Sequence, residues 1–262
     1  MPLIVRREHE GISGAAESAG RISFRINQLR LDSCISRGRT CARRRTPHRV
    51  TTGHARRLDH SAAASTRSRR RLLAVTIHMS RCNVVVIGAS AGGVSSLTSL
   101  VRCLPAGLEA AVAVALHVPE ESPSALPAIL SREGPLRATH AVDAEPLQHG
   151  RIYVAPPGRH LLVKRRTLRS VNGPNENGHR PAVDPLFRTA ARSHGRRTIG
   201  VVLSGSLDDG TAGLQSVKQH GGAALVQDPE DALFSGMPTS AIENVAVDFV
   251  GDVSALASEL SR

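Results

Sequence analysis

The chain contains 262 residues, of which 40% are hydrophobic and only 2% aromatic, and its formal net charge is +12. This length fits one α/β core of up to about 200 residues plus an extension, or two small domains. The lack of tryptophan and the single tyrosine argue against single-strand nucleic-acid binding by base stacking and against an aromatic-rich β-sandwich.

The positive charge is confined to the first part of the chain. Residues 1–80 contain 17 arginines, no lysine and five acidic residues, whereas residues 81–262 contain 17 basic and 17 acidic residues. Residues 1–78 are therefore expected to be a separate Arg-rich extension. The favoured interpretation is that translation starts at Met79, shortly before the first predicted strand. A disordered basic arm that contacts nucleic acid or an acidic surface, and an organelle transit peptide, remain open.

Cysteine spacing and hydropathy indicate the compartment. The four cysteines form no CxxC pair and no zinc-ligand spacing with histidine: Cys34, Cys41, Cys82 and Cys103. A reduced compartment fits this pattern better than a disulfide scaffold does. No apolar run approaches the roughly 18 residues of a membrane span, and the N-terminus lacks the apolar segment of a secretory signal. We therefore expect a cytoplasmic protein.

From residue 83 onward, short apolar runs alternate with helical patterns. Parallel strands are expected at 84–87, 110–116, about 136–141, 198–203, 223–227 and 247–250. Helices are expected at 93–103, about 124–131, 182–194 and 211–220, and from 238 and 253. Segments 151–156, 160–163 and 167–171 are predicted to be short antiparallel strands, followed by a polar loop at 173–181. The order predicts an α/β fold with a doubly wound, mainly parallel sheet, helices on both faces and a short antiparallel insertion.

Polar side chains follow three of the predicted parallel strands. The first is followed by GASAGG (88–93), the second by His117, and the strand at 198–203 by SGSLDDG (204–210). Sites in open parallel sheets form beyond the carboxyl ends of the strands. We therefore expect Ser90, His117 and one of the acids Asp208 and Asp209 to meet at one sheet edge, which is the composition of a Ser-His-Asp triad.

The segment 88–92 also fits the G-x-S-x-G pattern of a tight strand-to-helix turn that exposes a serine. A neutral imidazole within hydrogen-bond reach can take the serine proton, and a carboxylate on the far ring nitrogen fixes the tautomer. The glycines are expected to keep side chains away from the substrate. Backbone N–H groups at the start of the next helix are candidates for holding an oxyanion.

Other interpretations of these residues remain open. GASAGG is similar to a dinucleotide-binding turn, although Ser90 replaces the second fingerprint glycine and His117 stands where a ribose-binding acid is expected. His117 alone could cap a strand end, and either Asp208 or Asp209 could cap the helix at 211–220. The remaining histidines of this region lack ligand spacing and are expected to be solvated or structural: His140, His149, His160, His179, His194 and His220.

Six blocks of the chain together resemble a known family. They are VVVIGASAGGVSSL, ALHVPEESPSALPAIL, RIYVAPPGRHLLV, HRPAVDPLFRTAA, GVVLSGSLDDGTAGLQSVKQHGG and QDPEDALFSGMPTSAI. In this order, over about residues 83–260, they resemble the catalytic domain of CheB-type chemotaxis protein-glutamate methylesterases. The resemblance implies a doubly wound, mainly parallel fold. It also implies hydrolysis of glutamate methyl esters on receptors, with release of methanol, and deamidation of certain receptor glutamines.

The resemblance assigns roles to the candidate residues. It makes Ser90 the nucleophile, His117 the general base and Asp209 the residue that orients His117. It implies that no metal or cofactor takes part and that the partner is a methylated receptor of the methyl-accepting chemotaxis type. Binding of nucleic acid and insertion into a membrane are not expected for residues 79–262.

The chain also departs from the family pattern. Family members usually carry a phospho-acceptor receiver domain before the esterase, but residues 1–80 lack its alternating strand–helix pattern. A stand-alone catalytic domain at 79–262 is therefore expected. Ser206 stands where methionine is frequent, and Ala91 where many members have threonine. Two other functions stay open: a non-catalytic signalling module of the same fold, which the intact triad disfavours, and a small-molecule carboxylesterase.

Overall fold

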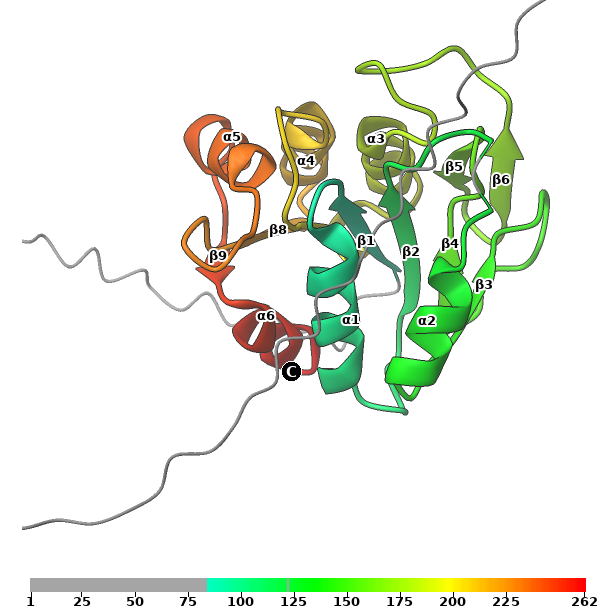
Figure 1. Ribbon diagram of the computed structural model, residues 1–262, viewed down its shortest axis with the longest axis horizontal. Helices are drawn as coiled ribbons and strands as arrows, with labels where there is room; N and C mark the ends of the chain where they lie inside the picture. The colour runs from blue at the N-terminus through cyan, green and yellow to red at the C-terminus, as the bar shows by residue number, and fades with distance from the viewer. Residues whose placement is uncertain (1–83, 122) are drawn as a thin grey trace, which may run out of the picture. The chain divides into compact units, whose positions relative to one another are not determined.

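The computed structural model describes residues 84–121 and 123–262. The predicted Arg-rich extension at 1–78, the candidate start Met79 and three of the four cysteines lie outside these residues. Within the described part, a parallel sheet is covered by helices on both faces (Figure 1), so the predicted fold class is confirmed. No helix in this part is both long and apolar enough to cross a membrane.

The seven strands of the main sheet are all parallel, in the order β3-β4-β2-β1-β7-β8-β9. They are β1 Val84–Ala89, β2 Ala111–Leu116, β3 Arg137–His140, β4 Arg151–Val154, β7 Thr198–Val202, β8 Ala223–Gln227 and β9 Phe249–Gly251. Strands β5 (His160–Val163) and β6 (Leu168–Val171) pair antiparallel in a separate small sheet. The helices are α1 Gly93–Cys103, α2 Leu126–Glu133, α3 Val183–His194, α4 Thr211–Gln219, α5 Gly236–Asn244 and α6 Val253–Leu260.

The prediction for segment 151–156 was wrong in direction. It was expected to be an antiparallel strand of the insertion, but it forms β4 and runs parallel to β2 and β3. Residues 141–150, which link β3 to β4, contain no helix, and a link of this kind is more typical of a hairpin. The buried Tyr153 holds the link to the sheet, because its hydroxyl donates to the Pro146 carbonyl and accepts from the Gln148 N–H.

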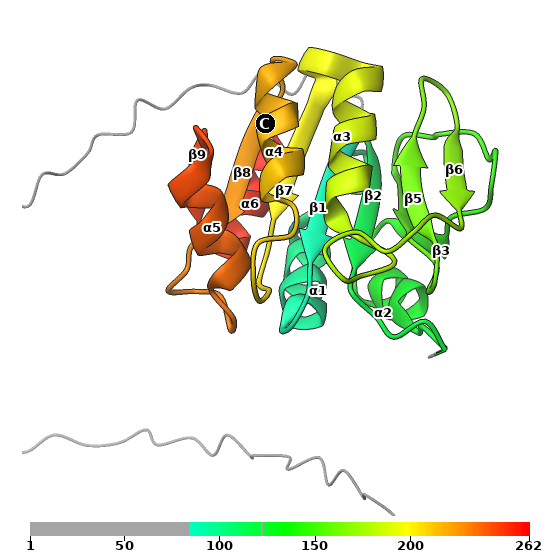
Figure 2. The same ribbon diagram turned by 90° about the horizontal axis from the view of Figure 1, so that it is seen from above.

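Each face of the sheet has its own apolar core. Val85 and Ile87 of β1 pack with α1, α2 and α6, whereas Val84 and Val86 pack with α3, α4 and α5. Figures 1 and 2 show these two helical layers on opposite sides of the strands. Strands covered on both faces have no polar side to present to water, which explains their continuous apolar sequences.

The order of the strands reverses at β1. The chain builds outward from β1 through β2 on one side and through β7 on the other. Helix α1 follows β1 onto one face, and α4 follows β7 onto the other face. The two connecting loops therefore diverge at the carboxyl ends of β1 and β7, which is where open α/β sheets bind their ligands.

Candidate active site

Three side chains from distant parts of the sequence meet at this edge of the sheet. Ser90 follows β1, His117 follows β2, and Asp209 lies in the loop between β7 and α4. The His117 Nδ1 atom lies 3.0 Å from the Ser90 Oγ atom, and the His117 Nε2 atom lies 2.7 Å from an Asp209 carboxylate oxygen. The His117 and Asp209 side chains are 6% and 3% exposed, so the hydrogen-bonded pair is shielded from water.

The two ring nitrogens of His117 face different partners. Its Nδ1 atom faces the serine and its Nε2 atom faces the carboxylate, the reverse of the order in chymotrypsin-like triads. A carboxylate can only accept, so the neutral ring carries its proton on Nε2. The Nδ1 lone pair is then free to accept the Ser90 hydroxyl proton.

Backbone contacts between neighbouring strand-end loops hold the serine turn. The Ser90 N–H donates to the Ser204 carbonyl, and the Ser204 hydroxyl donates to the Ala91 carbonyl. Gly92 has a φ of 73°, which glycine adopts without strain, and the Gly93 N–H donates to the Ser90 carbonyl. Within the described residues, the N–H groups of Ala91 and Gly92 donate to no acceptor, so they stay open to an oxygen beside Ser90.

Four donors surround the buried Asp209 carboxylate. One oxygen accepts from His117 Nε2 and from the Val183 N–H at 2.7 Å, and the other accepts from Asn177 Nδ2 at 2.7 Å and from the Asp184 N–H at 3.2 Å. Burial alone raises the pKa of Asp209, but these hydrogen bonds outweigh it and hold the pKa below its ordinary value. Asp209 is therefore ionised at neutral pH.

Val183 can approach Asp209 because Gly88, the residue of β1 that faces it, has no side chain. A Cβ atom on Gly88 would lie 2.2 Å from a Val183 methyl carbon. The Gly88 position therefore makes room for the first turn of α3. The glycines of this motif were expected to keep side chains away from the substrate, but Gly88 makes room for a helix.

The neighbouring acid, Asp208, is exposed and does not cap α4, whose N-cap is Gly210 without a side-chain capping bond. The side chain that performs this role is Asp184 of α3, a residue that was not predicted from the sequence. Its carboxylate accepts from the Gly210 N–H at 3.1 Å and the Gly213 N–H at 2.6 Å. Burial, and then the nearby charge of Asp209, raise the pKa of Asp184.

The loop between β6 and α3, residues 172–182, lies against the triad. The His179 ring stacks on the His117 ring with centroids 3.7 Å apart and planes 15° apart. Burial, and then the neighbouring His117, lower the pKa of His179, so this ring is uncharged at neutral pH. His179 was expected from the sequence to be solvated or structural rather than part of the site. A pocket of about 330 Å³ opens here between the loop and residues 117–120.

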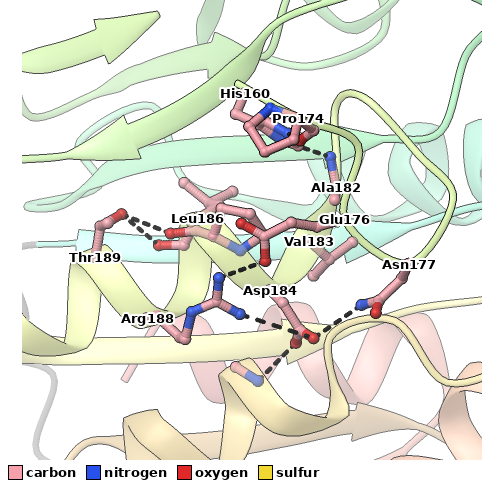
Figure 3. Close-up of polar contacts among 12 residues, drawn as sticks. His160, Pro174, Glu176, Asn177, Ala182, Val183, Asp184, Leu186, Arg188 and Thr189 are labelled. Atoms are coloured by element: carbon pink, nitrogen blue, oxygen red, sulfur yellow. Dashed lines mark hydrogen bonds and ion pairs between the residues drawn. The ribbon is translucent and has the colours of Figure 1, made fainter. Parts of the chain in front are cut away.

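Three of the histidines that were expected to be solvated or structural form hydrogen bonds with the backbone. His160 binds the Pro174 carbonyl and the Ala182 N–H (Figure 3), His194 binds the Lys164 carbonyl, and His140 binds the Ser124 carbonyl. In the part of the chain that the structure describes, no group of His, Cys, Asp and Glu side chains is arranged to hold a metal ion.

Comparisons with known proteins identify the family. The family model described as "CheB methylesterase" matches residues 85–260, which contain all three triad residues. The chain belongs to the CheB methylesterase family. The crystal structure of the CheB methylesterase catalytic domain of Thermotoga maritima is 33% identical, with a TM-score of 0.66, and the match covers 68% of this chain and 97% of that one.

Two curated relatives are named as protein-glutamate methylesterases and protein-glutamine glutaminases. The "Protein-glutamate methylesterase/protein-glutamine glutaminase 2" of Anaeromyxobacter dehalogenans is 40% identical over 182 residues, 70% of this chain and 53% of the relative. A "Putative protein-glutamate methylesterase/protein-glutamine glutaminase" of Leptospira interrogans is 36% identical over 179 residues, 68% of this chain and 93% of the relative. The chain thus spans about half of the first relative and almost all of the second.

Proposed function

We propose that this chain is a protein-glutamate methylesterase that works as a serine hydrolase through Ser90, His117 and Asp209. The observation that carries the proposal is the unbroken hydrogen-bonded path from the Ser90 hydroxyl through the buried imidazole to an ionised carboxylate. A serine hydroxyl needs such a base within reach before it can attack a carbonyl carbon.

The geometry supports a two-step reaction. Ser90 Oγ attacks the ester carbonyl carbon while its proton passes to His117 Nδ1, and the charge of Asp209 stabilises the resulting imidazolium. The open N–H groups of Ala91 and Gly92 are suited to hold the oxyanion. The imidazolium then protonates the leaving methoxide, and methanol departs. Water attacks the acyl-enzyme, with His117 again taking the proton, and regenerates Ser90 and a glutamate. With a glutamine side chain the leaving group is ammonia.

The substrate is proposed from the family. The relatives are named for glutamate methyl esters and glutamine side chains, and we extend this to receptors of the methyl-accepting chemotaxis type. Two other functions compete, a small-molecule carboxylesterase and a non-catalytic signalling module. A methyl ester on a receptor helix is much larger than a simple soluble ester. Comparing the rates on these two substrates therefore distinguishes a protein methylesterase from a small-molecule carboxylesterase.

The test is methanol release from a methylated receptor, measured beside hydrolysis of a simple ester. We expect Ser90-dependent methanol release, and Ser90→Ala should lower it by about 10⁴-fold or more. Hydrolysis of the simple ester alone would favour a carboxylesterase. No turnover of either substrate would favour the non-catalytic module, and turnover retained by Ser90→Ala would contradict the assigned nucleophile.

We also propose that residues 79–262 form the complete catalytic unit. All residues of the site lie within 84–262. A chain that begins at Met79 is expected to fold and to release methanol at the rate of the full chain. Loss of folding or turnover in the shorter chain would show that residues 1–78 contribute, and the intact mass of natively expressed protein would identify the start.

A further inference from the structure

One side-chain amide connects the two buried carboxylates of the site. Asn177 Nδ2 donates to an Asp209 oxygen at 2.7 Å and to an Asp184 oxygen at 2.9 Å. Figure 3 shows Asn177 reaching from the loop toward Asp184, whose other partners lie on α3 and at the start of α4. Asn177 is an exposed residue of the loop, yet its amide nitrogen is shared by two side chains that are 8% and 3% exposed.

The bond to Asp209 falls on the oxygen that does not face His117. The oxygen that binds His117 also accepts from the Val183 N–H at 2.7 Å. The other oxygen has only a 3.2 Å bond from the Asp184 N–H besides the short bond from Asn177. Asn177 therefore makes the shorter of the two bonds to this oxygen, and together with the contacts of the other oxygen it fixes the rotation of the carboxylate about its Cβ–Cγ bond. That rotation decides how an oxygen lone pair meets His117 Nε2.

The same amide also reduces the repulsion between two acids. Asp184 and Asp209 are buried next to each other, and the charge of Asp209 contributes to the raised pKa of Asp184. A neutral donor that gives one N–H to each carboxylate favours the ionised form of both. An acceptor at this position would instead add a third set of lone pairs facing two carboxylates.

We propose that Asn177 is the positioning residue of the Asp209 carboxylate: it holds the acid in the rotation, and in the ionised state, that binds His117. The proposal deepens the proposed function and rests on it for its kinetic consequences. Asn177 acts through Asp209 and makes no contact with Ser90 or His117 among the described contacts.

The loop has other anchors, which allow this role to be separated from loop order. Glu176 pairs with Arg188, and Arg180 pairs with Glu120; among the described hydrogen bonds and ion pairs, none joins these four side chains to Ser90, His117 or Asp209. Glu176→Gln removes the anchor next to Asn177 and is the matched control. Asn177 has a φ of 52°. Aspartate and glycine both tolerate this region, so Asn177→Asp and Asn177→Gly remove the donor without backbone strain.

The experiment compares the full chain with N177D, N177G, E176Q and D209N. The kinetic readout is kcat and KM for the ester against pH. We expect N177D and N177G to lower kcat by about 10- to 100-fold, the range for losing a hydrogen bond to a charged group, with KM within about twofold. In N177G the pKa of Asp209 should rise because a donor to its ionised form is lost, so the loss of kcat that comes from protonating Asp209 should begin at a higher pH. E176Q should keep the kcat and the profile of the unchanged chain.

A second readout does not depend on activity. The downfield proton NMR signal of the His117 Nε2–H reports its hydrogen bond to Asp209 and is assigned by its absence in D209N. We expect this signal in the unchanged chain and in E176Q, and its loss or broadening in N177D and N177G. If N177D fails to fold by circular dichroism, N177G gives the same comparison.

The two readouts distinguish the possible failures. An unaltered signal in N177G and N177D, or kcat losses in E176Q equal to those in N177G, would overturn the role of Asn177. An inactive unchanged chain that shows the signal, with the signal lost in D209N and in the Asn177 variants but kept in E176Q, would overturn the proposed function and leave the positioning role supported.

Discussion

The site has two parts that are held together in different ways. The strand-end loops that carry Ser90 and His117 are joined by backbone hydrogen bonds: Ser90 N–H to Ser204, His117 N–H to Ala89, and Leu203 N–H to Gly88. The β6–α3 loop, residues 172–182, is held mainly by side chains, through the ion pairs of Glu176 and Arg180, the amide of Asn177 and the ring of His179. The sheet therefore places Ser90 and His117, the proposed reacting groups, and the loop sets their surroundings.

This difference predicts unequal effects of substitution. Removing a reacting group that the sheet places should abolish chemistry while the fold persists. Removing a contact that the loop makes with His117 or Asp209 should change the rate by a smaller factor. The following substitutions test that ranking.

Besides Ser90→Ala, the largest effect is expected for Asp209→Asn. An amide at this position gives His117 Nε2 a group that can donate, which disfavours the tautomer that accepts the serine proton, and about a 10⁴-fold loss of kcat follows. The matched control is Asp208→Asn, because Asp208 is exposed and contacts neither His117 nor α4 through its side chain. Steady-state methanol release measures both variants. A greater loss in Asp208→Asn would exchange the roles of the two acids.

A smaller effect is expected for Ser204→Ala, which removes the side-chain hydrogen bonds between the strand-end loops. The fully buried Ser204 hydroxyl donates to the Ala91 carbonyl and accepts from the Phe234 N–H. Leaving these backbone groups without their partner should lower the free energy of unfolding by about 1–3 kcal/mol. Urea unfolding measures this change. An unchanged free energy of unfolding would mean that the hydrogen bonds of the Ser204 hydroxyl do not stabilise the turn that carries Ser90.

The ring contact of the loop should have a weaker effect. Stacked rings contribute about 0.5–1.5 kcal/mol beyond their buried area, so His179→Ala should lower kcat by about 2- to 10-fold. His179→Phe keeps a ring against His117 and should stay near the rate of the unchanged chain, because His179 is uncharged at neutral pH. Equal losses in the two variants would show that the imidazole nitrogens, rather than the stacking, matter.

The smallest effect concerns the pH dependence of stability. The pKa of Asp209 is lower in the folded chain than its ordinary value of about 3.9. Its stabilising contribution is therefore complete above that ordinary value and is lost as the pH falls through the folded pKa. The deficit of D209N in unfolding free energy should be constant from neutral pH to about pH 5 and shrink in stronger acid. A deficit that shrinks near neutral pH would contradict the lowered pKa.

The comparison also explains what the sequence could predict. The meeting of Ser90, His117 and Asp209 could be predicted because each follows an apolar run and the carboxyl ends of parallel strands share one edge. The direction of β4 was missed because it depends on pairing with β2 and on the packing of Tyr153, neither of which has a local pattern. Asp208 and Asp209 could not be separated by spacing alone, since only the packed positions of Val183 and His117 distinguish them.

Asn177 and His179 were missed for a related reason. Their contacts depend on the path of an irregular loop, and nothing in NENGHRP has a helical or strand period. One signal was available. Helices of α/β units begin at the carboxyl edge of the sheet, so the polar residues just before the helix at 182–194 belong to the same edge as the candidate triad.

Gly88, the first glycine of the serine motif, has a structural role besides forming the turn. With only a hydrogen atom on β1 at this point, the opening turn of α3 can settle against the strand, and two of its N–H groups reach the acid. A single methyl group there would lift the helix and withdraw both donors at once. The missing side chain of Gly88 thus couples the position of Ser90, the proposed nucleophile, to that of Asp209, because the same motif that carries the serine sets how closely the start of α3 approaches β1.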